Sequence, residues 1–217
     1  TVESPAVPLE EAPGTRTSLT PGTGETPEQS PDISGDIVVW SSYRDTSFDI
    51  IVYDLSSGKE IDITPDERCA NLPDAPYPDQ FDPAISGNFV IWTDARNIYP
   101  DIYVYNLSSG EELLLTRNTT DSNQISPDVA DDRVVWSDDR NKGPYYYDIY
   151  LCNLSTGEEK VISAEIVGYS LENARIYQDY VVCEGLDLVN GTYDIFLYHI
   201  RNETWAILTP DTPVSDQ

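Results

Sequence analysis

The chain is poor in the residues on which disulfide frameworks and most catalytic sites depend. Its 217 residues include no Met, one His and three Cys. Three Cys allow at most one bridge within the chain, which excludes a disulfide framework. Cys152 and Cys183 stand where other copies of an internal repeat have aromatic residues, so we expect buried free thiols. A chain that starts at Thr1, without Met or a signal peptide, indicates a mature product or an excised segment.

Basic residues are also scarce. The 12 Lys and Arg face 39 Asp and Glu, which gives a formal net charge of -27. This charge repels phosphate backbones and anionic lipids, so we expect no nucleic-acid partner and no membrane-surface partner. No apolar run approaches the roughly 20 residues that span a bilayer. The partners compatible with this charge are cations, basic proteins and neutral glycans. An adaptation to a salty medium explains the acidic surface equally well.

Motifs that carry chemistry are missing. The sequence has no nucleophile elbow, no His-Glu-x-x-His, no phosphate loop and no Cys pair at zinc spacing. His199 replaces the Asp or Asn found at the same place in other repeats, so we expect a turn residue. The many carboxylates leave glycosidase activity as an alternative, although no two of them stand out as a catalytic pair. We expect a non-enzyme without a cofactor. Calcium is the alternative, although the acidic loops include no Asp-x-Asp-x-Asp-Gly motif.

What the chain does have is an internal repeat of two interleaved motifs. The first motif occupies 31–40 and recurs at 83–92, at 127–136 and, in a degenerate form, at 174–183. The second occupies 49–58 and recurs at 101–110, 148–157 and 194–203. Four such copies define repeats at about 31–82, 83–126, 127–173 and 174–217.

Each repeat predicts four short strands, A to D. In the first repeat A is the Pro-x-Ile segment, B is 37–40, C is 50–53 and D is 61–64; the later D strands are expected at 113–116, 161–163 and 206–209. Gly35 and Gly58 suit the tight A–B and C–D turns. Strands B and C are apolar on consecutive residues, so both faces of each sheet need a cover. The sequence therefore predicts an all-β propeller of four-stranded antiparallel blades, four-bladed or part of a larger ring. A linear solenoid is the competing architecture.

These motifs carry a family resemblance. The run at 101–110, followed by a Leu-Thr strand, Gln-x-x-Pro and a Gly turn, resembles TolB-like propeller repeats of exported proteins. Trp-x-Asp-x-Arg at 92–96 and 136–140 is similar to repeats of archaeal, methanogen-type cell-surface proteins. The resemblance covers about 31–210 and departs at Ser42 and throughout repeat four, where Cys183 replaces Trp. It implies the fold and an extracellular or cell-surface location, but no particular activity.

Residues 1–30 form a Pro-, Gly- and Thr-rich extended segment that contains a surplus D-like strand at Thr17, Ser18, Leu19 and Thr20. The surplus has three explanations. The chain is cut from a larger array, or the segment is a linker, or the spare strand pairs with an open sheet edge. That edge belongs either to its own ring or to a neighbouring molecule, and repeated donation between copies builds a filament.

Two further sets of residues are candidates for contact and modification. The B–C loop face is expected to gather Arg44, Phe48, Arg96, Tyr99, Arg140, Tyr145, Tyr146 and Tyr147. Aromatic rings beside polar groups bind sugars or proteins. The alternative for the Asp-x-Arg pairs is a structural ion pair between blades, whereas the Tyr insertion breaks the repeat and is the better contact candidate. Five sequons favour export and candidate glycosylation: Asn106, Asn118, Asn153, Asn190 and Asn202.

The sequence predicts a non-catalytic extracellular or cell-surface structural protein that assembles with itself. Pairing of the N-terminal strand with a neighbour would produce a filament or a surface layer. The alternative is a glycan- or protein-binding module that uses the Tyr- and Arg-rich loop face. The partners expected are further copies, neighbouring propellers, or a surface glycan or protein.

Overall fold

The computed structural model describes residues 18–19, 27–44, 46–65, 79–117, 121–143 and 146–209. This part of the chain forms sixteen strands in four antiparallel sheets, with no helix. Each sheet is a meander of four consecutive strands, which is the structure of a propeller blade. Blade 1 contains β1 (Glu28–Ser34), β2 (Ile37–Arg44), β3 (Ser47–Asp54) and β4 (Lys59–Asp62). Blade 2 contains β5 (Gln80–Ser86), β6 (Phe89–Asp94), β7 (Asp101–Asn106) and β8 (Glu111–Leu114).

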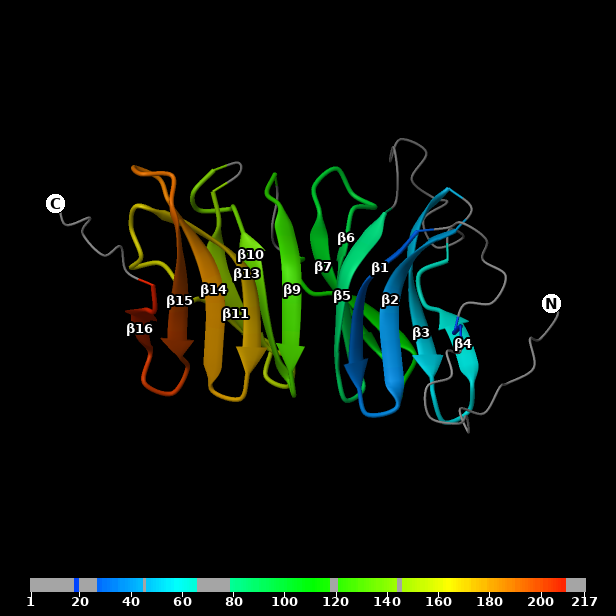
Figure 1. The fold of residues 1–217 in the computed structure, drawn as a ribbon. Helices are drawn as coiled ribbons and strands as arrows, with labels where there is room; N and C mark the ends of the chain where they lie inside the picture. Colours follow the sequence, from blue (N-terminus) through cyan, green and yellow to red (C-terminus); the bar gives the residue numbers. More distant parts are fainter. Residues whose placement is uncertain are drawn as a thin grey trace, which may run out of the picture.

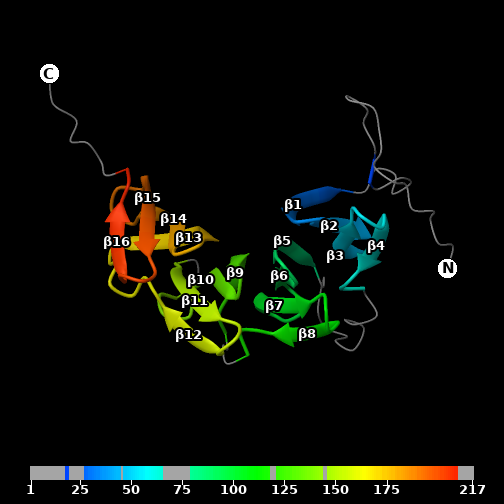
Figure 2. The same cartoon turned by 90° about the horizontal axis from the view of Figure 1, so that it is seen from below.

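Blade 3 contains β9 (Gln124–Ala130), β10 (Arg133–Asp138), β11 (Asp148–Asn153) and β12 (Glu158–Val161). Blade 4 contains β13 (Tyr169–Tyr177), β14 (Tyr180–Asp187), β15 (Tyr193–His199) and β16 (Thr204–Ile207). The blades stand side by side (Figure 1) and follow an arc when seen from below (Figure 2). The first strands β1, β5, β9 and β13 lie innermost and contact one another in turn along the arc. The predicted propeller architecture is confirmed, and blades 1 and 4 are the two ends of the arc.

The turns match the predicted glycine positions. Gly35 and Gly58 have φ of 59° and 67°, in the left-handed region that favours glycine. The C–D turn is capped by the side chain that follows strand C. In blade 1 the Asp54 carboxylate accepts hydrogen bonds from Ser56 and Ser57, and these bonds lower the pKa of Asp54 to about 2. In blade 4 Nδ1 of His199 accepts from the backbone N–H of Asn202. His199 is the last residue of β15 and its side chain caps the turn, whereas the sequence predicted a turn residue.

The D strands begin two or three residues earlier than the sequence predicted, at Lys59, Glu111, Glu158 and Thr204. Pairing starts directly after the turn, and the Leu-Thr signature follows the strand. Thr116 illustrates its role, because its hydroxyl accepts a hydrogen bond from Ile102 N and donates one to Asp101. The threonine therefore replaces a ladder bond with a side-chain bond at the start of strand C.

The core consists of layers between neighbouring blades. At each junction an aliphatic face of one blade packs on a tryptophan face of the next. Between blades 1 and 2 the aliphatic face supplies Val39 and Ile50, and the tryptophan face supplies Val90 and Trp92. The same positions meet at the next two junctions. Cys183 takes the place of Trp at the last junction, and it and Cys152 are buried free thiols as expected, while Cys69 lies outside the described residues.

Candidate interaction surfaces

The Asp-x-Arg element of blade 2 is a buried cluster within one blade. The Asp94 carboxylate accepts from Trp92 Nε1 at 2.9 Å, from Arg96 Nε at 2.9 Å and from Arg96 Nη2 at 2.6 Å. Arg96 also pairs with Glu112 on β8 and lies 4.2 Å over the ring of Tyr103. Burial lowers the pKa of Arg96, but the Asp94 and Glu112 carboxylates outweigh it and hold that pKa above its ordinary value.

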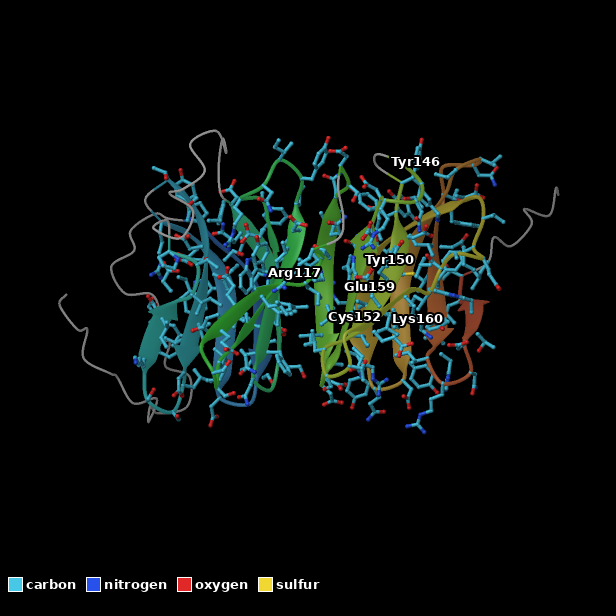
Figure 3. The ribbon with its side chains drawn as sticks, turned by 180° about the vertical axis from the view of Figure 1, so that it is seen from behind. Arg117, Tyr146, Tyr150, Cys152, Glu159 and Lys160 are labelled. Atoms are coloured by element: carbon cyan, nitrogen blue, oxygen red, sulfur yellow. The ribbon has the colours of Figure 1, made fainter. Side chains whose placement is uncertain are left out.

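Blade 3 repeats the arrangement. Trp136 Nε1 and Arg140 both donate to Asp138, and Arg140 pairs with Glu159 at 2.7 Å and lies over the ring of Tyr150. Figure 3 shows Tyr150 and Glu159 along the blade, well away from the loop end where Tyr146 lies. The ion pairs join strands of one blade instead of two blades, which differs from the structural alternative considered from the sequence. With its donors committed inside the blade, the element has a scaffold role in this geometry.

Blade 1 shows what happens when the aspartate is missing. Ser42 stands in its place, and Ser42 accepts a hydrogen bond from Arg44, whose guanidinium also pairs with Glu60. In the described part of the chain, Trp40 Nε1 is buried without a hydrogen-bond partner. A buried unpaired donor costs about 1–3 kcal/mol. Blade 1 therefore has a weaker version of the same cluster.

The loop end, where the B–C and D–A connections lie, exposes a set of apolar side chains. Its exposed members are Ile98, Tyr99, Tyr146, Val167, Leu188 and Val189. They come from the connections of blades 2, 3 and 4, and Figure 3 shows Tyr146 at this end. Exposed aromatic and aliphatic side chains on neighbouring loops are typical of binding surfaces.

The structure separates the aromatic residues expected at this end. Tyr146 is 46% exposed, whereas Tyr147 is 8% exposed and its backbone N–H donates to Ser170. Phe48 packs edge-on against Tyr43 with 5.3 Å between ring centroids. Tyr145 lies outside the described residues. Tyr99 and Tyr146 are therefore the expected rings that the structure leaves accessible.

Of the expected strand-donating segment, Ser18 and Leu19 are described, while Thr17 and Thr20 are not. Neither described residue belongs to a strand. Leu19 packs against the tryptophan face of blade 1, next to Trp40 and Val38. Beside these residues lies an apolar groove of about 230 Å³, also lined by Glu28, Gln29 and Pro31.

Two of the four described sequons have an exposed asparagine. Asn190 and Asn202 lie in turns of blade 4. Asn106 and Asn153 cap C–D turns, where their side-chain oxygens accept from Ser108 N and Thr156 N. Asn118 lies outside the described residues. Asn190 and Asn202 are thus the better-placed acceptors for a glycan.

The thiols of Cys152 and Cys183 are poorly reactive. Burial raises the pKa of Cys152 to about 11 and that of Cys183 to about 12, so both are protonated at neutral pH. Within the described residues no group of three or more His, Cys, Asp and Glu side chains is placed to hold a metal ion. The described part also contains no helix long and apolar enough to cross a membrane.

Sequence reasoning did not identify the outer face of blade 4. In blades 1 to 3 the aliphatic-face positions equivalent to Val182 and Ile195 are all 0% exposed against the next blade. Val182 and Ile195 themselves are 37% and 36% exposed, and Leu208 beside Ile195 is 53% exposed. The only signal in the sequence was the worn fourth repeat, with Arg175 where two other repeats have Asp.

The fold and these surfaces define a propeller-type arc of meander blades. Sequence comparison finds no matching protein family and no matching curated protein. Structure comparison finds TolB from Acinetobacter baumannii, 19% identical over 86% of this chain and 44% of that one, with a TM-score of 0.62. A puromycin-hydrolyzing peptidase from Mycobacterium tuberculosis is 12% identical over 86% of this chain and 30% of that one, with a TM-score of 0.60.

A third similar structure is the β-propeller domain of the Trilobed protease from Pyrococcus furiosus, which has an open velcro topology. It is 12% identical over 86% of this chain and 58% of that one, with a TM-score of 0.57. The chain spans less than two thirds of each of these proteins. At such identities the likeness shows the fold, a TolB-like β-propeller arrangement, and leaves the activity open.

Proposed function

We propose that this chain is a non-catalytic structural module of an exported, cell-surface protein and that it works by associating with other protein through blade 4. The observation that carries the proposal is the exposure of Val182, Ile195 and Leu208 at positions that the other blades bury. Their cover at the other junctions is a neighbouring blade, so a protein surface is the natural cover here. The sequons and the resemblance of the Trp-x-Asp-x-Arg repeats to archaeal surface proteins support export.

The charge distribution also favours the outer face of blade 4 as the association surface. On its strands β13 to β15 the residues that point outward include one base, Arg175, and two acids, Glu172 and Glu184, in a chain of net charge -27. A near-neutral apolar face is the part of an acidic protein where association meets least repulsion.

Sedimentation velocity over a wide concentration range tests the proposal. We expect the unmodified chain to associate as its concentration rises, and the double variant Val182→Asp, Ile195→Asp to stay monomeric with an unchanged circular dichroism spectrum. Val189→Asp is the matched control, because Val189 is 87% exposed at the loop end. A wild-type chain that is monomeric throughout, or a double variant that associates equally well, contradicts the proposal.

The N-terminal segment is a second route to assembly. Leu19 packs on blade 1 of its own chain. If the segment acts instead on a neighbouring copy, Leu19→Asp abolishes association while the blade 4 face is intact. Association that survives Leu19→Asp and is lost in the double variant assigns the contact to blade 4.

The loop end favours a second candidate function, the binding of a glycan or protein. Its support is the exposure of Tyr99 and Tyr146 beside Ile98 and Val189. A glycan array tests this function. Binding that is lost in the double variant Tyr99→Ala, Tyr146→Ala would support it if the control Tyr177→Ala, which alters an exposed ring at the other end of blade 4, still binds. Equal binding by both variants would remove it.

A further inference from the structure

The two ends of the arc carry the two halves of one repeated interface. Blade 4 ends on an aliphatic face, and blade 1 begins on a tryptophan face with Val38 and Trp40. At the first two junctions inside the molecule an aliphatic face packs on a tryptophan face, and at the third it packs on the equivalent face of blade 4, where Cys183 replaces Trp. One chain therefore presents both partners of a contact that it already makes three times.

The tryptophan face of blade 1 is incompletely covered. Ile33 is 58% exposed, whereas its equivalents Ile85, Val129 and Ile176 are 5%, 6% and 6% exposed because they pack on the preceding blade. The apolar groove beside Trp40 continues this surface and has Leu19 on its wall. At the first internal junction Val39 packs among Ile85, Val90 and Trp92. Val182 is the equivalent of Val39, and the groove is bounded by the equivalents of Val90 and Trp92.

The two end blades also differ in charge at the inner edge of the arc. The four inner strands carry a single base, Arg175, which lies on the aliphatic side of blade 4. Blades 1 and 3 have an aspartate at the same position. Asp32 accepts a hydrogen bond from Ile85 N of blade 2, and Asp128 accepts one from Ile176 N of blade 4. On blade 1 the tryptophan side of β1 carries Glu28, which lines the groove beside Trp40, whereas Asp32 points to blade 2, and β1 has no base. Arg175 lines a cavity of the inner edge together with Asp32 and Asp128 of its own chain, so the apolar match of the two end faces carries the pairing.

We infer that a second copy of this chain docks the aliphatic face of its blade 4 on the tryptophan face of blade 1. The inference rests on the proposed function and names its partner. The contact is heterologous, so its repetition winds copies into a filament unless the ends close on each other. Because the contact is apolar and the copies are strongly acidic, added salt strengthens it by screening their repulsion.

Two variants with one defective face each test the pairing. Ile33→Asp damages the tryptophan face of blade 1, and Ile195→Asp damages the aliphatic face of blade 4. Both side chains are at least a third exposed, so the blades tolerate the change. We expect each variant alone to be monomeric in sedimentation velocity, because like variants cannot join. A mixture of the two still has one sound face of each kind, so it forms dimers and nothing larger. Val189→Asp serves as the control and assembles like the unmodified chain.

The outcomes separate the pairing from the wider proposal. Dimers in the mixture support the head-to-tail contact. If Ile33→Asp assembles like the unmodified chain while Ile195→Asp does not, blade 4 docks on some other surface, and the inference fails while the proposed function stands. If the unmodified chain and both variants are monomeric at all concentrations and salt levels, both fail.

Discussion

Replacement of Asp94 by Ser gives blade 2 the residue that blade 1 has at Ser42. The change removes the acceptor of Trp92 Nε1 and the closest partner of Arg96. The Asp94 side chain is 0% exposed and the Arg96 side chain 11% exposed, so water cannot replace the lost bonds. Glu112 still holds one end of the guanidinium.

The magnitude follows from this burial. Removal of one partner from a buried ion pair costs about 3–5 kcal/mol, and the unpaired indole N–H adds to that cost within the same range. We therefore expect Asp94→Ser to lose about 4 kcal/mol of unfolding free energy. At about 2–4 °C per kcal/mol for a domain of this size, the melting temperature falls by roughly 10 °C.

Urea unfolding followed by tryptophan fluorescence measures the loss, with the slope of the transition checked for constancy. Glu112→Gln is the control, because it removes only the outer carboxylate and should cost about 1 kcal/mol or less. A loss below about 1 kcal/mol for Asp94→Ser, the usual value of an exposed ion pair, would refute the scaffold role of the Asp-x-Arg element.

Three further predictions follow from single sites. Gly185→Ala should cost about 1–3 kcal/mol in thermal unfolding, because a Cβ there collides with the Phe196 ring; an unchanged melting temperature would show that the ring moves aside. Thr116→Val should cost about 2 kcal/mol by removing the hydroxyl that bonds Ile102 N and Asp101, which leaves Asp101 with its bond from Asn97, whereas Thr116→Ser should be neutral; equal melting of the two variants would contradict this. The lowered pKa of Asp54 contributes stability that is present above pH 3.8 and is lost as the pH falls through about 2. A carboxyl titration of Asp54 by NMR with a midpoint near 3.8 would show that the Ser56 and Ser57 bonds do not form.

The internal repeat was enough to predict the blades because the repeat encodes local geometry. Turn residues at Gly35 and Gly58 and the apolar strands between them act within one blade, where sequence spacing is sufficient. Strand D was placed too late because the Leu-Thr signature resembles a strand, although Thr116 bonds through its hydroxyl. A sequence pattern does not distinguish a ladder bond from a side-chain bond that replaces it.

The surfaces were harder to predict because burial depends on the neighbour of each side chain. Val182 and Val39 are the same residue type at the same repeat position, and only the presence of a next blade buries one and leaves the other exposed. Arg96 and Arg140 looked available for recognition in the sequence, yet their donors meet carboxylates of the same blade. Tyr147 belongs to an insertion and is buried all the same.

Hydroxyl-radical footprinting at low and high protein concentration tests the central claim at the level of single side chains. If blade 4 is the association surface, oxidation of Ile195 and Leu208 falls as the concentration rises, while that of Val189 at the loop end stays constant. Oxidation of Ile195 and Leu208 that is independent of concentration, in samples that do associate, would contradict the account.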